Sequence, residues 1–180
     1  RKALDINDKF HHGWYNLSLL ERKRGNTDLE KEYLQKCLEI KPDYIDALNA
    51  LGNIYYARGE YDDARETYIK CLRSNPNYKY PYYNLGLIEE VNMNFEKALA
   101  YYEKAIDCDP NYQLAIDSKA EMEKKLETEK GYLGESAGLD KKDGGTEVDE
   151  EVEEIKRDAS FIGKMGRNLN SLAKNGKLKE

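Results

Sequence analysis

The 180-residue sequence has no long hydrophobic run, two histidines and three cysteines. No apolar stretch approaches the ~18 residues of a membrane-spanning helix, and residues 1–10 contain no apolar core of a signal peptide. The net charge of −6 argues against a nucleic-acid partner, because phosphates attract basic surfaces. With no Cys-x-x-Cys pair, we expect no metal site, no disulfide and a reducing, cytoplasmic setting.

A period of 34 residues organises what the sequence does contain. Pro42, Pro76 and Pro110 are 34 residues apart, and Leu51-Gly52 recurs as Leu85-Gly86. The same spacing relates four aromatic residues: Phe10, Tyr44, Tyr78 and Tyr112. A fixed period of this size is typical of an array of repeated structural units.

Each unit has the pattern of a helical hairpin. In the middle copy, the spacing of Leu48, Leu51 and Tyr55 places them on one helical face. Gly59 then interrupts the helix, and Pro76 ends a second apolar stripe. That stripe consists of Tyr61, Ala64, Tyr68, Cys71 and Leu72. We expect the small residues Gly52 and Ala64 to let the two helices approach closely, and the cysteines to be small buried residues.

These positions make the unit resemble the tetratricopeptide repeat. The resemblance implies an all-α fold, a right-handed solenoid of helical hairpins with a C-terminal capping helix. The predicted segments are 1–10 (the end of a truncated upstream repeat), three repeats at 11–44, 45–78 and 79–112, a capping helix at 113–130, a linker at 131–146 and an amphipathic or disordered tail at 147–180.

Two copies depart from the pattern. In the first copy, Ser18 replaces the glycine and Glu30 replaces the alanine, so we expect its second helix to pack more loosely. In the third copy, the turn between the helices contains Asn92 and Asn94 but no glycine. We expect an asparagine to take the left-handed backbone conformation there, because asparagine tolerates it better than most residues.

The resemblance also implies that the first helices line a groove for a peptide. The predicted groove residues are His12, Tyr15, Asn16, Arg22, Lys23, Asn49, Asn53, Tyr56, Tyr80, Tyr83, Asn84 and Leu87. Asparagine amides can pair with any peptide backbone, and tyrosines add apolar contact with a polar tip. The chain is therefore expected to bind a protein or peptide partner as a scaffold or adaptor.

One subclass of the family grips a terminal carboxylate with two asparagines and three basic residues. Asn53 and Asn84 match the asparagines, but Asn49, Leu114 and Ser118 stand at the basic positions. The charges that would bind a carboxylate are missing. We therefore expect no carboxylate clamp in these repeats.

No set of residues indicates catalysis or a cofactor. His11 and His12 are adjacent, so they cannot both face one metal ion on a helix. Two alternatives to a scaffold remain open at this point. The array could be the substrate-recognition part of a larger enzyme, such as a glycosyltransferase, or a self-association module.

The tail carries an interrupted amphipathic pattern. Its apolar positions are Val148, Val152, Ile155, Ala159, Ile162, Leu169 and Leu172. Thr146 followed by Asp149 resembles a helix N-cap, whereas Gly163 and Gly166 weaken the helix. The tail is either disordered or docked. We expect residues 147–172 to dock on the array, to cover part of the groove and to approach Arg22 and Lys23 with their acidic start.

Overall fold

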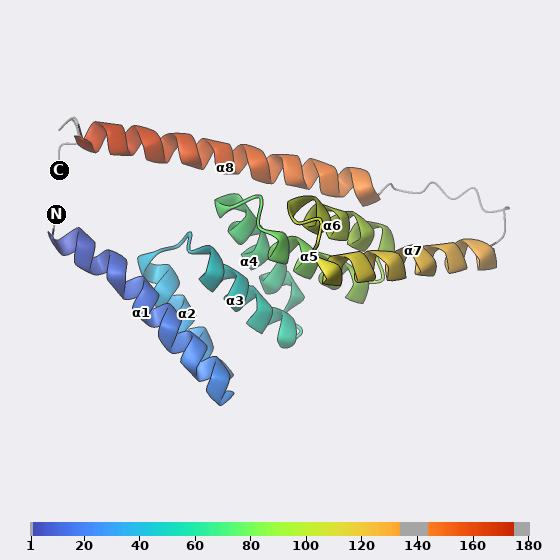
Figure 1. The fold of residues 1–180 in the computed structure, drawn as a ribbon, viewed down its shortest axis with the longest axis horizontal. Helices are drawn as coiled ribbons and strands as arrows, with labels where there is room; N and C mark the ends of the chain where they lie inside the picture. Colours follow the sequence, from blue (N-terminus) through green and yellow to red (C-terminus); the bar gives the residue numbers. More distant parts are fainter. Residues whose placement is uncertain (1, 134–143, 175–180) are drawn as a thin grey trace.

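The computed structural model describes residues 2–133 and 144–174, and all their regular secondary structure is α-helix. Side chains are described for 10–128, 145–161 and 163–165. The helices are α1 (Lys2–Arg24), α2 (Thr27–Ile40), α3 (Ile45–Ala57), α4 (Tyr61–Ser74), α5 (Lys79–Val91), α6 (Phe95–Cys108), α7 (Gln113–Leu133) and α8 (Gly144–Lys174) (Figure 1). None of these helices is long and apolar enough to cross a membrane.

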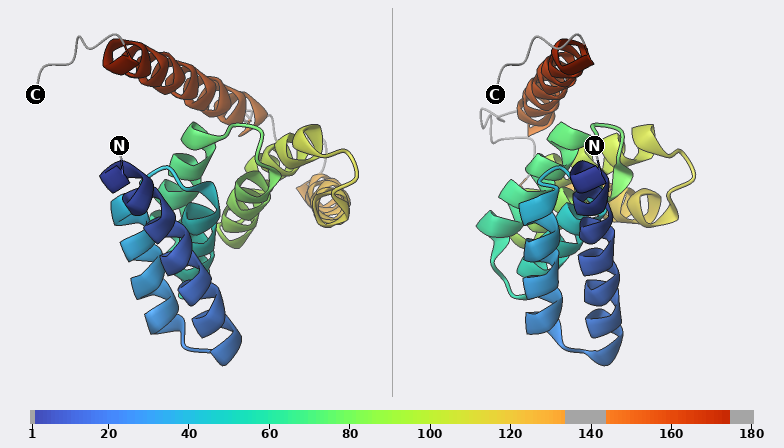
Figure 2. Two further views of the ribbon diagram at one scale, coloured as in Figure 1. Left: turned by 60° about the vertical axis from the view of Figure 1, so that its left-hand side comes forward. Right: turned by 90° about the vertical axis from the view of Figure 1, so that its left-hand side faces the viewer.

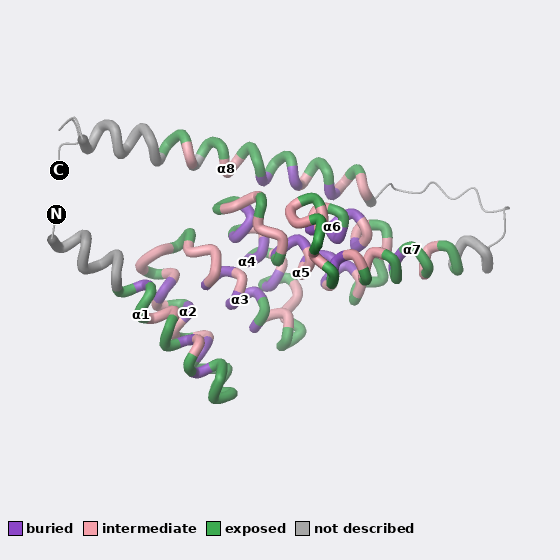
Figure 3. The backbone as a smooth tube through the Cα atoms, in the orientation of Figure 1, coloured by how far each residue is buried: buried purple, intermediate pink, exposed green. Residues whose placement is uncertain are grey.

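Consecutive helices pair as hairpins, α1 with α2, α3 with α4 and α5 with α6. The second helix of each hairpin then contacts the first helix of the next, so the hairpins stack along one direction (Figure 1). This arrangement confirms the predicted all-α solenoid. The buried residues, purple in Figure 3, lie along the helices of the hairpins.

Helix α1 does not break where the periodicity places a repeat boundary. The predicted remnant, residues 1–10, continues into the first hairpin as a single helix from Lys2 to Arg24. The reason lies at Asp8, which stands 34 residues before Pro42. Aspartate keeps its backbone N–H and clashes with no preceding carbonyl, so it does not end a helix as proline does.

Glycine sets the close approach of the helices in the second and third hairpins. A Cβ added at Gly52 would collide with the ring of Tyr68, and one at Gly86 with the ring of Tyr102. Both tyrosines are fully buried. The predicted role of Gly52 is therefore confirmed, and the residue that needs the space is the tyrosine sixteen positions later.

The first hairpin reaches the same packing with different residues. Leu34 stands where the other hairpins have tyrosine, which leaves room for the buried side chain of Ser18. Glu30 is also buried, and its carboxylate accepts a hydrogen bond of 2.6 Å from Arg22 Nε. The expectation of a loosely packed second helix is wrong, because Leu34 and Cys37 of α2 are fully buried.

The turns inside the three hairpins share one backbone conformation. Gly25, Gly59 and Met93 lie 34 residues apart and have φ of +76°, +75° and +58°. In the third turn Met93, and neither of the flanking asparagines, takes the left-handed conformation. The repeat period fixes the position that must be left-handed, and methionine occupies it at the cost of backbone strain.

Helix α7 covers the last hairpin as a cap. Met122 of α7 is fully buried against Ala98 and Tyr102. Most charged residues of α7 are exposed (Figure 3). Lys119 Nζ pairs with Glu103 at 3.0 Å and fixes α7 to α6. The helix runs to Leu133, three residues beyond the predicted end.

The tail forms one long helix, α8, that lies across α4 and α6 (Figures 1 and 2). It begins at Gly144, so Thr146 lies inside the first turn and is not the N-cap. Gly163 and Gly166 do not interrupt it, because glycine lowers helix propensity but keeps the backbone hydrogen bond. The side chains of Ile162, Leu169 and Leu172 lie outside the described set.

The predicted coverage of the groove by the tail is wrong. Helix α8 packs on the second helices of the hairpins, with Val148, Val152 and Ile155 fully buried. Its acidic residues pair with bases on α4 and α6 and not with Arg22 or Lys23. The physical reason is charge: Arg22 already pairs with Glu30, whereas α4 and α6 present four bases to α8.

Candidate functional site

The first helices α1, α3 and α5 carry the twelve predicted groove residues, which we call the first-helix face. None of the twelve is buried. The side chains of His12, Asn16, Arg22, Lys23, Asn53 and Tyr80 are exposed, and those of Tyr15, Asn49, Tyr56, Tyr83, Asn84 and Leu87 are partly buried. The stacking of α3 against α5 brings the asparagines of neighbouring repeats together.

An asparagine ladder forms the centre of this face. Asn84 Nδ2 donates a hydrogen bond of 2.9 Å to Asn53 Oδ1, which also accepts one of 2.7 Å from the hydroxyl of Tyr68. Asn49 Oδ1 lies 3.5 Å from the same Asn84 amide. Within the described residues, Asn53 Nδ2 and Asn84 Oδ1 have no partner, so the ladder offers one amide NH2 group as donor and one amide oxygen as acceptor outward.

Aromatic rings extend the face on both sides of the ladder. Tyr83 packs edge-on against Tyr112 with ring centroids 5.4 Å apart, and Tyr80 packs against Tyr112 at 5.7 Å. Towards the N-terminal side, Tyr15 packs edge-on against Tyr44 at 5.2 Å. Burial raises the pKa of Tyr15. The Tyr15 phenol therefore stays neutral at physiological pH. Together the rings present aromatic surface with hydrogen-bonding tips.

The charged ends of the face are less available than the sequence suggests. The Arg22 guanidinium is held by Glu30 within α1 and α2. At the opposite end, Glu90 accepts hydrogen bonds from Lys125 of α7 at 2.8 Å and from Tyr102 at 3.0 Å. Sequence reasoning missed Lys125, because no repeat position predicts a contact from the capping helix.

The two histidines lie at the start of the first-helix face. His11 is buried and its ring centroid lies 3.9 Å from that of His12 and 5.1 Å from that of Tyr44. Both therefore belong to the aromatic packing around Tyr44. Among the side chains that the structure describes, no three of His, Cys, Asp and Glu gather as ligands for a metal ion.

A second polar centre lies between α4, α5, α6 and α8, and sequence reasoning missed it. Arg65 Nη1 donates to the buried carboxylate of Glu89 at 2.5 Å, while Arg65 Nη2 contacts both oxygens of Glu151 at 3.1 Å. Arg65 Nη2 also donates to the Tyr101 hydroxyl at 2.9 Å, and that hydroxyl donates to Glu151. Burial, together with the Glu151 charge, raises the pKa of Tyr101, which keeps it a neutral donor.

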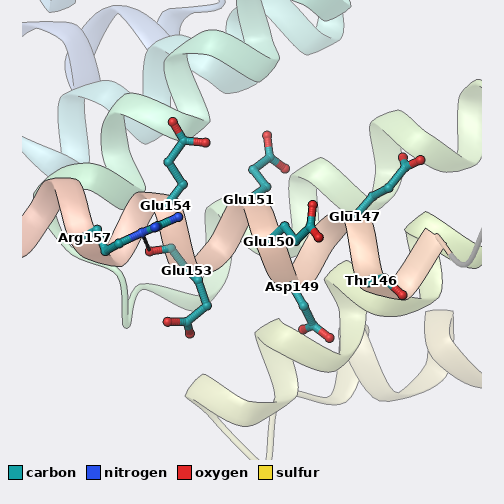
Figure 4. Close-up of a pocket in the computed structure, with 8 residues that line it drawn as sticks. All are labelled: Thr146, Glu147, Asp149, Glu150, Glu151, Glu153, Glu154 and Arg157. Carbon is teal, nitrogen blue, oxygen red and sulfur yellow. Dashed lines mark hydrogen bonds between the residues drawn. The ribbon is translucent and has the colours of Figure 1, made fainter.

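The flanks of α8 carry most of its acidic residues. A shallow pocket there is lined by Thr146, Glu147, Asp149, Glu150, Glu151, Glu153, Glu154 and Arg157 (Figure 4). All eight belong to one helix, and Arg157 Nε donates to the backbone carbonyl of Glu153 at 3.3 Å. A pocket lined by a single helix is only a gap between neighbouring side chains and is not a ligand site. The acidic residues of α8 act instead through their ion pairs with α4 and α6.

Comparison with known proteins identifies the repeat. One family model of the tetratricopeptide repeat matches residues 11–44, and a second matches residues 49–112. The chain is a tetratricopeptide repeat protein. Members of this family generally serve as protein-interaction modules. A search of curated proteins found no match to the sequence of this tetratricopeptide protein.

Solved structures with the same fold include peptide-binding arrays. The first TPR domain of Spaghetti (RPAP3), bound to the HSP90 peptide SRMEEVD, matches with a TM-score of 0.61 and 16% identity over 65% of this chain and 93% of its own. YrrB, a TPR protein with an unusual peptide-binding site, matches at 0.57 and 26% identity over 66% of this chain and 64% of its own. The Thermobaculum terrenum O-GlcNAc transferase matches at 0.60 and 19% identity over 64% of this chain but 22% of its own.

Proposed function

We propose that this tetratricopeptide protein is a scaffold or adaptor whose first-helix face binds an extended peptide segment of a partner protein. The observation that carries the proposal is the asparagine ladder. Asn53 and Asn84 are already oriented by hydrogen bonds to each other and to Tyr68. A peptide backbone can therefore pair with the remaining donor and acceptor without a cost in side-chain ordering.

The location of α8 supports the same proposal. Helix α8 packs on α4 and α6, which are the second helices of their hairpins, and leaves the exposed side of Asn53 and Tyr80 in contact with water. Two solved relatives in fold, the Spaghetti domain and YrrB, are described as peptide-binding. The proposed activity is binding without catalysis, in a cytoplasmic setting.

The bound peptide is not held by its terminal carboxylate. Leu114 is 56% exposed and Ser118 is partly buried, so the positions where the clamp would place bases carry no positive charge. A carboxylate gains little from an uncharged surface. We expect the peptide SRMEEVD to bind this chain at least ~100-fold more weakly than an internal peptide segment selected on it, since each lost charged hydrogen bond is worth about 1.5–3 kcal/mol.

A peptide selected from a random library on the full chain tests the proposal. Asn53→Ala with Asn84→Ala should raise the Kd of that peptide about 5- to 150-fold, because two hydrogen bonds of about 0.5–1.5 kcal/mol each are lost. The matched control is Glu66→Ala with Lys70→Ala, an exposed pair on α4. The measurement is isothermal titration calorimetry of each variant.

The control variant should bind the peptide as the unchanged chain does. An unchanged Kd in the asparagine variant would contradict the proposal. So would protection of α4 and α6, and not of α3 and α5, from hydrogen exchange when the peptide binds.

A further inference from the structure

The face of α4 and α6 that α8 covers is built around an anchored arginine; we call it the second-helix face. Arg65 is held by Glu89, a carboxylate of the array that is 5% exposed. Asn94 Nδ2 donates to the other oxygen of Glu89 at 2.9 Å. Both of these contacts come from the array and not from α8. Arg65 Nη2 and the Tyr101 hydroxyl both donate to the carboxylate of Glu151, the residue that α8 contributes.

The apolar part of this face takes three side chains spaced along a helix. Val148, Val152 and Ile155 are each 2% exposed and pack into a cluster that includes Leu72, Tyr82 and Tyr101. With Glu151, they define a pattern of apolar residues at i, i+4 and i+7 and a glutamate at i+3. The spacing keeps all four side chains on one side of a helix.

Basic residues lie beside the apolar cluster, and their charge favours a helix with acidic residues. Lys104 Nζ pairs with Asp149 at 2.6 Å, Lys97 Nζ with Glu147 at 2.6 Å and Arg73 Nε with Asp158 at 3.1 Å. Lys97 and Lys104 come from α6 and Arg73 from α4. The cations therefore follow the length of the docked helix, on the same face as Arg65.

We propose that the second-helix face is a binding site for an acidic amphipathic helix of another protein, and that α8 is its built-in, displaceable occupant. The partner helix carries the pattern of α8, apolar residues at i, i+4 and i+7 with a glutamate at i+3 and further acids on its flanks. This site is separate from the first-helix face and does not depend on the function proposed for that face.

The contacts of α8 make displacement feasible. Among the α8 side chains that the structure describes, the three that are completely buried lie in the first half of the helix, whereas Phe161 and Met165 are exposed at 63% and 49%. The flanking ion pairs are partly exposed, and such pairs contribute little each and weaken with salt. Because the pair of Arg65 and Glu89 lies within the array, we expect it to persist when α8 leaves. Arg65 then remains in place to bind the glutamate of an incoming helix.

A partner protein fits this site better than a second copy of the chain. Every copy carries its own α8, joined to α7 through residues 134–143, so its own helix competes at an effective concentration on the order of millimolar. A second copy gains nothing by exchanging one identical helix for another. A partner helix that has no site of its own can displace α8 once its affinity or local concentration exceeds that of the tethered helix.

The test uses a labelled peptide of residues 144–161 and the full chain. Val152→Asp in the chain removes the central apolar contact of α8 and opens the site. Fluorescence anisotropy should show the unchanged peptide binding this opened chain about tenfold or more tighter than the original chain, because the tethered competitor is gone. Glu151→Lys in the chain, which places a lysine against Arg65, is a second way to open the site and should give the same gain.

Exchanging the charges of Lys104 in the chain and Asp149 in the peptide tests whether the peptide binds at the second-helix face. Lys104→Glu added to the opened chain should weaken the unchanged peptide, and a peptide with Asp149→Lys should regain affinity for that variant only. The peptide with Val152→Asp is the negative control. The proposal is overturned if both opened chains bind the peptide no better than the original chain, or if light scattering shows the original chain to be a dimer that Glu151→Lys converts to a monomer.

Discussion

The first-helix face runs over all three hairpins and the second-helix face over the second and third, and the two faces differ in polarity. On the first-helix face, Asn53 and Asn84 satisfy part of each other's hydrogen-bonding capacity, and the tyrosines carry polar tips. Such a surface is compatible with water. On the second-helix face, α4 and α6 present an apolar cluster around Tyr101 with bases beside it, and α8 covers it.

The difference shows why the tail docks where it does. An amphipathic helix is marginal alone in water and is stabilised where it can bury its apolar stripe. The second-helix face offers both apolar area and the opposite charge, whereas the one arginine at the first-helix face is paired with Glu30. The described part of α8 therefore occupies the second-helix face and leaves the first-helix face uncovered.

The largest expected effect comes from the interior that both faces share. Gly86→Leu should lower the free energy of unfolding by about 3 kcal/mol, because the new side chain overlaps the buried ring of Tyr102. Gly13→Leu is the matched control, since nothing lies within 4 Å of a Cβ at Gly13. Urea denaturation measures both; equal stabilities would show that the tyrosine–glycine contact does not set the hairpin spacing.

The next largest effect compares how much stability the array and α8 each provide to the ion pairs of Arg65. Arg65→Ala should cost about 2–3 kcal/mol, less than the 3–5 kcal/mol of a fully buried pair, because Arg65 is one-third exposed and Asn94 still bonds Glu89. Glu151→Gln should cost below ~1 kcal/mol and increase hydrogen exchange in residues 145–158. If the two variants lose equal stability, Arg65 is anchored by α8 and not by the array.

A smaller effect concerns the turn that joins the two faces in the third hairpin. Met93→Gly should raise the free energy of unfolding by about 1 kcal/mol, because Met93 has φ of +58° and glycine takes this conformation without strain. Gly59→Ala, at the equivalent turn, should lower it by a similar amount. Thermal melts of the two variants that shift in the same direction would contradict the assignment.

The smallest effect is a dependence on alkaline pH at the aromatic edge of the first-helix face. Burial, and then the neighbouring Tyr83, raises the pKa of Tyr112 from 10.0 to about 12. Between these values the unfolded chain loses the proton and the folded chain keeps it, so the stability is present below pH 10 and is lost as the pH rises through 12. Tyr112→Phe should reduce the slope of unfolding free energy against pH; an unchanged slope would place the titration elsewhere.

The repeat architecture was predictable because its signals are periodic. The spacing of Pro42, Pro76 and Pro110 predicted the hairpins, and Gly52 and Gly86 predicted their close contact. The compensation of Ser18 by Leu34 was not predictable, because it requires knowing which residue of the second helix faces position 18. The left-handed residue of the third turn was predicted wrongly as an asparagine; it is Met93, which stands 34 residues after Gly59.

The two faces likewise differ in how far the sequence predicts them. Sequence placed the twelve residues of the first-helix face on exposed or partly exposed positions, and their role in binding stays a prediction. The second-helix face was missed because Arg65, Glu89, Tyr101 and Glu151 are contributed by four different helices, and no spacing links them. The amphipathic stripe of α8 predicted that it docks, but pattern alone does not say on which face.

The most direct test of the account is a methyl-to-aromatic NMR experiment on the full chain. Helix α8 on the second-helix face predicts nuclear Overhauser contacts from the methyl groups of Val148, Val152 and Ile155 to the rings of Tyr82 and Tyr101. It predicts none to Tyr80 or Tyr83 of the first-helix face. Contacts to Tyr80 or Tyr83, or the absence of any contact from the three residues, would contradict the claim that α8 occupies one face and leaves the other open.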